Sequence, residues 1–475
     1  MSLFGDSQLP PGWSAGTVLD CTVRLDRLGS PVRREVLGVS LHSLQAEGDY
    51  PFLRYQMRYN LPMDIQQDIK ALRLTGLAVG GGLDDVLDAG GTGPVLQGYQ
   101  TLSHLWDIPP EHIVVCLGSA DPGLRYQDPE QVAARAIELV DRGFLVFEVE
   151  DEPYRSAWNG DSRFPYSQAG ESAYLDYLQS VYRHVKRVAP HARILVSVYR
   201  PQAEWWGMDM LARAQGFYDG IAIHQYQRGT VGANAYGGMT FQQWAVSEPV
   251  WLHSQIRQLL PYGPVYVTRW GSDSLGASGS PVRDGNIYAL AAGAYRLMLL
   301  LEEPEVRYAG HWKLVDASGL DPSGKFLFVQ PLRPGRRGFL YWLYYYFSRY
   351  TGRYRLDVEG IAPVSMLEDS EGADRVGLVT PVLATMSDRA DAVYLAILNG
   401  SWSNQYSATI RPSGDAVWTS ASGVALSHDD PDAVGVVDGP PDALVSPAQV
   451  TVYWNRIAFG LPPRSLVLLR VGVSV

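Results

Sequence analysis

The sequence predicts an α/β fold, a (β/α)8 TIM barrel followed by a C-terminal β-sandwich domain that also takes the N-terminal strand. Short apolar segments alternate with amphipathic ones up to residue 352. These apolar segments show little period-two alternation, as expected for strands buried on both faces of a parallel sheet. From about residue 365 the pattern changes to short alternating strands separated by Gly, Asp and Pro, which is typical of a sandwich. We therefore expect domains at residues 1–30, 31–360 and 361–475.

The expected barrel contains eight strand–helix units, which favours a closed barrel over an open doubly wound sheet. Helix signals occur between the strands, for example an Asp128-Pro129 start and a Gly143 stop. Open doubly wound sheets often bind a dinucleotide through a Gly-x-Gly-x-x-Gly motif between a strand and a helix. No such motif follows a strand and opens a helix in this sequence, so this reason to expect an open sheet does not apply. The expected barrel strands are residues 35–43, 76–82, 112–119, 144–153, 192–199, 219–226, 265–271 and 309–316.

The expected sandwich draws on both ends of the chain. Segment 17–29 has a strand pattern and precedes the barrel, so we expect it to pair with the C-terminal strands. Those C-terminal strands are expected at residues 392–401, 406–412, 416–421, 449–455 and 465–473.

Composition and charge exclude several classes of function. Of the 475 residues, 46% are hydrophobic and 19% are charged, which is typical of a soluble globular protein. The longest apolar run, 289–301, contains Arg296 and is too short to span a bilayer. A net charge of −11 argues against nucleic acid as a partner. Cys21 and Cys116 show neither metal-ligand spacing nor disulfide density, so we expect no metal and no cofactor.

Two further features bear on location and ligand. The first residues lack the charged and apolar pattern of a signal peptide, and an extracellular location stays open if a leader has been removed. The chain holds 28 Tyr and 13 Trp against 12 Phe. Tyr and Trp combine an apolar face with a polar group, which suits a wet sugar-binding cleft, although surface packing explains the bias equally well.

Carboxylates crowd the end of the fourth expected strand, in the stretch "FEVEDEP". In a (β/α)8 barrel the chemistry lies at the carboxyl ends of the strands. Strand alternation places Glu148, Glu150 and Glu152 on one side and Asp151 on the other. The pattern indicates a general acid in a sugar cleft, and a surface loop neutralised by nearby basic residues is the alternative.

Four motifs in order resemble retaining glycoside hydrolases of the large (β/α)8 clan, most closely family 39, the β-xylosidase and α-L-iduronidase family. "FEVEDEPY" resembles the fourth-strand Phe-Glu-x-Trp-Asn-Glu-Pro, and "DGIAIHQY" resembles the sixth-strand Asp-x-Ile-x-x-His-x-Tyr. "VYVTRWGS" resembles the seventh-strand Thr-Glu-Trp/Phe-Gly/Asn. "LPPRSLVLLRV" resembles the closing strand of the sandwich, so the likeness covers nearly the whole chain.

The resemblance implies roles for individual residues. Glu152 falls on the acid/base position, and Asp151 replaces the Asn that holds the sugar 2-hydroxyl. Other candidates for substrate binding are Glu150, His224, Tyr226, Trp270, Trp312, Trp205 and Trp206. A structural role is the alternative for four of them: a core histidine for His224, barrel filling for Trp312, and loop packing for Trp205 and Trp206.

The likeness breaks at the nucleophile. Retaining hydrolysis uses two carboxylates about 5 Å apart, and the second should be the Glu between Thr and Trp of the seventh-strand motif. This sequence has Arg269 there, and a guanidinium is always protonated and has no acceptor. A lone buried charge is costly, so we predict an ion pair between Arg269 and Asp151 or Glu152. The catalytic site is therefore expected to be degenerate.

Three functions remain open. The first is a pseudoenzyme that binds an oligosaccharide or polysaccharide in the barrel cleft without retaining hydrolysis. The second is an active glycosidase with Glu152 as general acid and Asp273 or Glu150 activating water, an inverting route that needs carboxylates about 6.5–9.5 Å apart. The third is a structural or protein-interaction module.

Overall fold

A computed structural model shows how the chain folds. It describes residues 18–42, 63–80, 103–104, 106–117, 128–154, 164–228, 243–273, 287–312, 315–316, 328–329, 336–361, 364–368, 374–428, 437–438 and 444–474.

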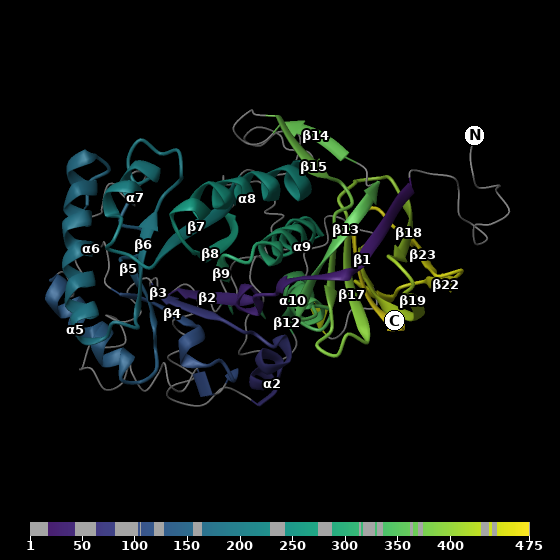
Figure 1. Cartoon of the computed structure of the whole chain (residues 1–475), viewed down its shortest axis with the longest axis horizontal. Helices are drawn as coiled ribbons and strands as arrows, with labels where there is room; N and C mark the ends of the chain where they lie inside the picture. Colours follow the sequence, from purple (N-terminus) through teal and green to yellow (C-terminus); the bar gives the residue numbers. More distant parts are fainter. Residues whose placement is uncertain are drawn as a thin grey trace.

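The barrel consists of eight parallel strands in a closed ring (Figure 1). All eight expected strands are present in the expected order, so this part of the prediction is confirmed. The ring closes where the last strand pairs with the first, through Gly38 opposite Gly310 and Val39 opposite His311. The strands are β2 (Gly38–His42), β3 (Leu77–Gly80), β4 (Ile113–Leu117), β5 (Val146–Val149), β6 (Arg193–Val198), β7 (Gly220–Arg228), β8 (Val265–Asp273) and β9 (Val306–Trp312).

Helices pack around the barrel. The Asp128 side chain accepts a hydrogen bond of 2.8 Å from the Glu130 backbone N–H, which caps α5 where the sequence predicts a start. No helix in the described part of the chain is both long enough and apolar enough to cross a membrane. The α-helices are α2 (Met63–Leu72), α5 (Pro129–Val140), α6 (Gln168–Val188), α7 (Met208–Ala214), α8 (Glu248–Leu259), α9 (Ile287–Glu302) and α10 (Phe339–Phe347). Shorter helical turns are η2 (Arg34–Val36), η3 (Pro110–His112), η5 (Gln243–Ser247) and η6 (Leu260–Tyr262).

The second domain is built on a ten-stranded sheet in the order β21-β19-β24-β17-β16-β13-β1-β18-β23-β22. Its strands are β1 (Val18–Pro31), β13 (Tyr354–Ile361), β16 (Val382–Met386), β17 (Ala392–Asn399), β18 (Tyr406–Pro412), β19 (Val417–Leu426), β21 (Val445–Pro447), β22 (Val450–Tyr453), β23 (Arg456–Leu461) and β24 (Ser465–Ser474). Smaller sheets pair β10 (Val315–Asp316), β11 (Phe328–Val329), β12 (Arg336–Arg337) and β20 (Val437–Asp438), and separately β14 (Val364–Glu368) with β15 (Asp374–Leu378).

The N-terminal strand β1 lies inside this sheet, as predicted. Cys21 pairs with Gly360 of the antiparallel β13 and with Ile410 of the parallel β18. Figure 1 shows β1 in purple among the green and yellow C-terminal strands. Residues from both halves of the sheet, such as Ile397 and Phe459, share one buried core, so the sheet folds over on itself.

An apolar layer fills the barrel near the amino ends of its strands. The Tyr308 hydroxyl in this layer donates a 2.7 Å hydrogen bond to the Val39 carbonyl, which satisfies a polar group that would otherwise be buried without a partner. The layer leaves the carboxyl ends of the strands to polar side chains. Its members are Ala78, Val114, Val146, Leu195, Ala222, Tyr266 and Tyr308.

Two matched substitutions test the core of the second domain. Val393 is 0% exposed and Val417 is 45% exposed, and both lie in the ten-stranded sheet. We expect Val393→Ala to lower the free energy of unfolding by about 2 kcal/mol, because it removes buried methyl groups and leaves a cavity. Val417→Ala should cost less than about 0.5 kcal/mol. Urea denaturation measures both, and equal losses would contradict the folded-over sheet.

Candidate functional site

The end of β5 departs from regular strand geometry at the carboxylates. The strand ends at Val149, and Glu150 and Glu152 both have positive φ angles, of 69° and 49°. Positive φ is uncommon for residues other than glycine and marks a constrained backbone. The strict alternation expected from the sequence, with Asp151 facing away from Glu152, is therefore wrong. Asp151 and Glu152 both bond to side chains from the neighbouring ends of β7 and β8.

An extra residue in β8 directs Arg269 into the barrel. Ala222 pairs with Tyr266, and the next paired residues are His224 and Arg269, so β8 contains one more residue than β7 over this stretch. Tyr266 belongs to the apolar layer inside the barrel. Without the bulge, alternation would point Trp270 inward; with it, Arg269 takes that direction.

Arg269 forms a buried ion pair with Asp151. Its Nη2 lies 2.7 Å from Asp151 Oδ1, and the two side chains are only 4% and 7% exposed. The predicted ion pair is thus present, and its acidic partner is Asp151. Burial acts to lower the pKa of Arg269, but the negative charge of Asp151, together with Tyr226, Glu152 and Glu148, outweighs it and raises that pKa well above its ordinary value. The guanidinium stays charged at every accessible pH.

His224 lies between two carboxylates. Its Nδ1 is 2.9 Å from Glu152 Oε1, and its Nε2 is 3.1 Å from Glu148 Oε1. Burial acts to lower the pKa of His224, but the charge of Glu148 and the hydrogen bonds to both carboxylates raise it to about 9. At neutral pH the ring is therefore an imidazolium that donates one N–H to each carboxylate.

Residues from α6 and β6 hold this strand end in place. The buried Tyr174 hydroxyl donates to the Val149 carbonyl at 3.0 Å and accepts from the Ser197 N–H at 3.0 Å. The Ser197 hydroxyl lies 3.1 Å from the Glu150 carbonyl and 3.5 Å from Glu148 Oε1. These bonds fix the backbone that carries the carboxylates.

Two of the predicted aromatic residues come together beside the charged groups. The rings of Tyr226 and Trp312 meet edge to face, with centroids 5.3 Å apart and planes at 75°. Both residues are partly exposed at the carboxyl ends of β7 and β9. Tyr226 is also close enough to Arg269 to affect its pKa. The structure thus brings Glu152, His224, Tyr226 and Trp312 to the same end of the barrel.

Three predicted substrate contacts need correction. Trp206 is 0% exposed and packs against Tyr174 with ring centroids 5.0 Å apart, so it is not a sugar platform. Trp270 is 4% exposed and packs outside the barrel against His311, because of the bulge in β8. Glu150 is 0% exposed and cannot reach a ligand.

Two other candidates stay open. Trp205 is half-buried against the core between the barrel and its helices. The backbone of Asp273 ends β8, but its side chain lies outside the described residues.

Sequence reasoning did not assign a role to Glu148, the second carboxylate on His224. The available signal was the period of two along β5, which places Glu148 inside the barrel. Glu148 is 3% exposed, so its role is to hold His224 and its proton in place. In the described part of the chain, no group of three or more His, Cys, Asp or Glu side chains is arranged to hold a metal ion.

Comparisons with known proteins identify the fold. No protein-family profile matches the chain, and no curated protein matches its sequence. Solved structures match over nearly the whole length. A family 51 arabinofuranosidase from Xanthomonas axonopodis pv. citri has a TM-score of 0.71 at 15% identity, over 96% of this chain and 99% of that chain.

Two further neighbours agree. A family 51 α-L-arabinofuranosidase from Bifidobacterium longum has a TM-score of 0.71 at 12% identity, over 96% of this chain and 100% of that chain. A family 44 xyloglucanase from Paenibacillus polymyxa has a TM-score of 0.62 at 12% identity, over 96% and 100%. The chain therefore has a glycoside hydrolase-like fold, a (β/α)8 barrel with a β-sandwich. A specific kinship to family 39 remains a prediction.

The pKa of His224 predicts how stability depends on pH. The folded-state pKa of about 9 lies above the ordinary value of 6.5. The charged ring of His224 therefore makes its full contribution to the free energy of unfolding below about pH 6.5. That contribution is lost as the pH rises through about 9. Relative to His224→Gln, the wild type should lose about 3 kcal/mol of unfolding free energy across this window. Denaturant titrations at several pH values measure the difference, and a constant difference would contradict the charged ring.

Proposed function

We propose that the protein binds an oligosaccharide or polysaccharide at the carboxyl end of the barrel and does not hydrolyse it by the retaining mechanism. The observation that carries the proposal is the buried Arg269–Asp151 ion pair. A retaining hydrolase needs an attacking carboxylate about 5 Å from its acid/base residue. Arg269 occupies the corresponding strand position and cannot act as a nucleophile.

The ion pair also resists rearrangement. Both side chains are almost fully buried. Breaking such a pair by removing one partner leaves an uncompensated charge and costs about 3–5 kcal/mol. Arg269 is therefore held where it is, and Asp151 is not free to take over the attack because its charge is committed to the guanidinium.

The polar and aromatic groups support carbohydrate as the ligand. The partly exposed Tyr226 and Trp312 offer ring faces and edges on which sugar C–H groups can pack. Glu152, whose side chain is 15% exposed, offers an acceptor for hydroxyl groups. One similar structure is an arabinofuranosidase with arabinose, and another is a xyloglucanase with xyloglucan. Arabinose-containing and xylose-containing oligosaccharides are accordingly the first ligands to test.

A second candidate is an active glycosidase that uses Glu152 as general acid. The observation in its favour is the hydrogen bond from the His224 imidazolium to Glu152, which keeps a proton next to the acid position. Glu152 could pass that proton to a leaving oxygen and recover it from His224. This candidate also requires a second carboxylate that activates water.

Hydrolysis assays separate the two candidates. We expect no release of nitrophenol from nitrophenyl α-L-arabinofuranoside, β-xyloside or β-glucoside above the rate without protein. Turnover that disappears in Glu152→Gln would instead establish the second candidate. The product's anomeric configuration, read by NMR, then decides the mechanism, because retention would show that a nucleophile exists.

Binding assays test the ligand class. We expect Trp312→Ala to weaken binding of xyloglucan or arabinan oligosaccharides at least tenfold, about 1.4 kcal/mol, because it removes a ring at the site. The control is Trp454→Ala, since Trp454 is 90% exposed on the other domain. Isothermal titration calorimetry measures both. Equal effects of the two substitutions, or no binding at millimolar oligosaccharide, would count against the proposal.

A further inference from the structure

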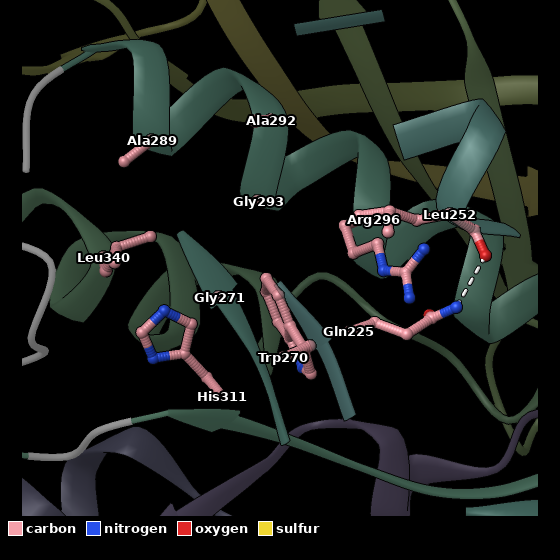
Figure 2. A pocket seen from close by; sticks show the side chains of 10 residues that line it. All are labelled: Gln225, Leu252, Trp270, Gly271, Ala289, Ala292, Gly293, Arg296, His311 and Leu340. Atoms are coloured by element: carbon pink, nitrogen blue, oxygen red, sulfur yellow. Dashed lines mark hydrogen bonds between the residues drawn. The ribbon is translucent and has the colours of Figure 1, made fainter. Parts of the chain in front are cut away.

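We propose that Arg296 binds one monovalent anion the size of chloride in a pocket on the outer face of the barrel. The pocket lies between α8, α9 and the strands β7 to β9 (Figure 2). It is on the opposite side of β8 from the Arg269–Asp151 pair, because Trp270, which lines it, points outward. It is thus separate from the proposed carbohydrate site.

Arg296 is a buried cation that has no hydrogen-bond partner among the described residues. The residue lies in α9 and is 2% exposed. Within the described part of the chain, its Nε, Nη1 and Nη2 atoms all lack a hydrogen-bond partner. A guanidinium carries five N–H donors and does not lose its charge in proteins. Burying it without an opposite charge is strongly destabilising, so the fold requires a compensating anion.

The acidic group nearby is already committed. Arg296 is close enough to His253 to affect the pKa of that ring. One carboxylate on this side, Glu303, lies 3.1 Å from His253 Nε2 and 2.8 Å from Arg257 Nε. Burial lowers the pKa of Arg296 to about 9, and no carboxylate among the described residues opposes that change.

Trp270 adds a second unpaired donor to the pocket within the described part of the chain. The Trp270 Nε1–H lines the same pocket and has no hydrogen-bond partner in the part of the chain that is described. Gln225 commits its Nε2 to the Leu252 carbonyl at 2.8 Å and to Gln255 Oε1 at 3.3 Å, so its amide supplies no free donor. Its Oε1, an acceptor, has no hydrogen-bond partner among the described residues. Figure 2 shows Arg296, Gln225 and Trp270 grouped around this space. The indole and guanidinium donors match an anion, whereas a cation would be repelled.

The size of the pocket selects the ligand. The free space is about 10 Å³, the scale of one water molecule. A monatomic anion such as chloride or bromide fits with small adjustments, whereas phosphate, sulfate or a carboxylate ligand is too large. A neutral water fits by size but leaves the charge of Arg296 uncompensated. A halide satisfies both requirements.

Thermal unfolding in two salts tests the site. Wild-type protein is compared in sodium chloride and in sodium gluconate at the same ionic strength, because gluconate is too large for the pocket. A ligand that binds only the folded state raises Tm, and we expect chloride to raise it by about 2 °C or more. Arg296→Met should abolish this difference. Arg187→Met, which removes an exposed arginine from α6, should retain it.

Each outcome is decisive. Equal Tm values in the two salts for the wild type, or a chloride effect that persists in Arg296→Met, would overturn the proposal. If Arg296→Met does not fold, crystals of the wild type grown with sodium bromide provide the second measurement. An anomalous bromine peak within hydrogen-bond distance of the Arg296 guanidinium supports the site, and its absence refutes it.

Discussion

The buried ion pair between Arg269 and Asp151 sets the character of the site. It joins the end of β5 to the end of β8 with a contact of 2.7 Å between two almost fully buried side chains. Next to it, His224 joins Glu148 and Glu152 in the same way. Both cations, Arg269 and His224, are held by carboxylates, and the three carboxylates outnumber the two cations.

The strand β8 presents a charged side chain to the inside of the barrel and an aromatic side chain to the outside. Its bulge turns Arg269 inward to the charge of Asp151 and Trp270 outward to the pocket that holds Arg296. The two arginines illustrate the same rule, that a buried guanidinium needs an anion. Inside the barrel the chain supplies that anion as Asp151. Outside it, we infer that solvent supplies one.

Much of the fold was predictable from the sequence because the barrel strands are continuous apolar runs bounded by Gly and Pro. The Arg269–Asp151 pair was also predictable, since the positions of both residues follow from the strand motifs and an isolated charge needs a partner. The direction of Trp270 was not, because one inserted residue in β8 reverses the alternation. Likewise, the burial of Trp206 involves packing against Tyr174, a contact that the sequence pattern does not reveal. The positive φ angles at Glu150 and Glu152 break the strand alternation on which the sequence prediction relied.

Covalent trapping shows whether the barrel carries a nucleophile for retaining hydrolysis. Sugar analogues that form a stable ester with the nucleophile of a retaining glycosidase, such as 2-deoxy-2-fluoroglycosyl fluorides or glycosyl epoxides, are incubated with the protein in arabinose, xylose and glucose configurations. Intact-mass spectrometry then measures labelling. We expect an unchanged mass, because Arg269 stands where the nucleophile would be. A mass increase of one glycosyl unit, mapped by peptide sequencing to a carboxylate at the carboxyl end of the barrel, would contradict it.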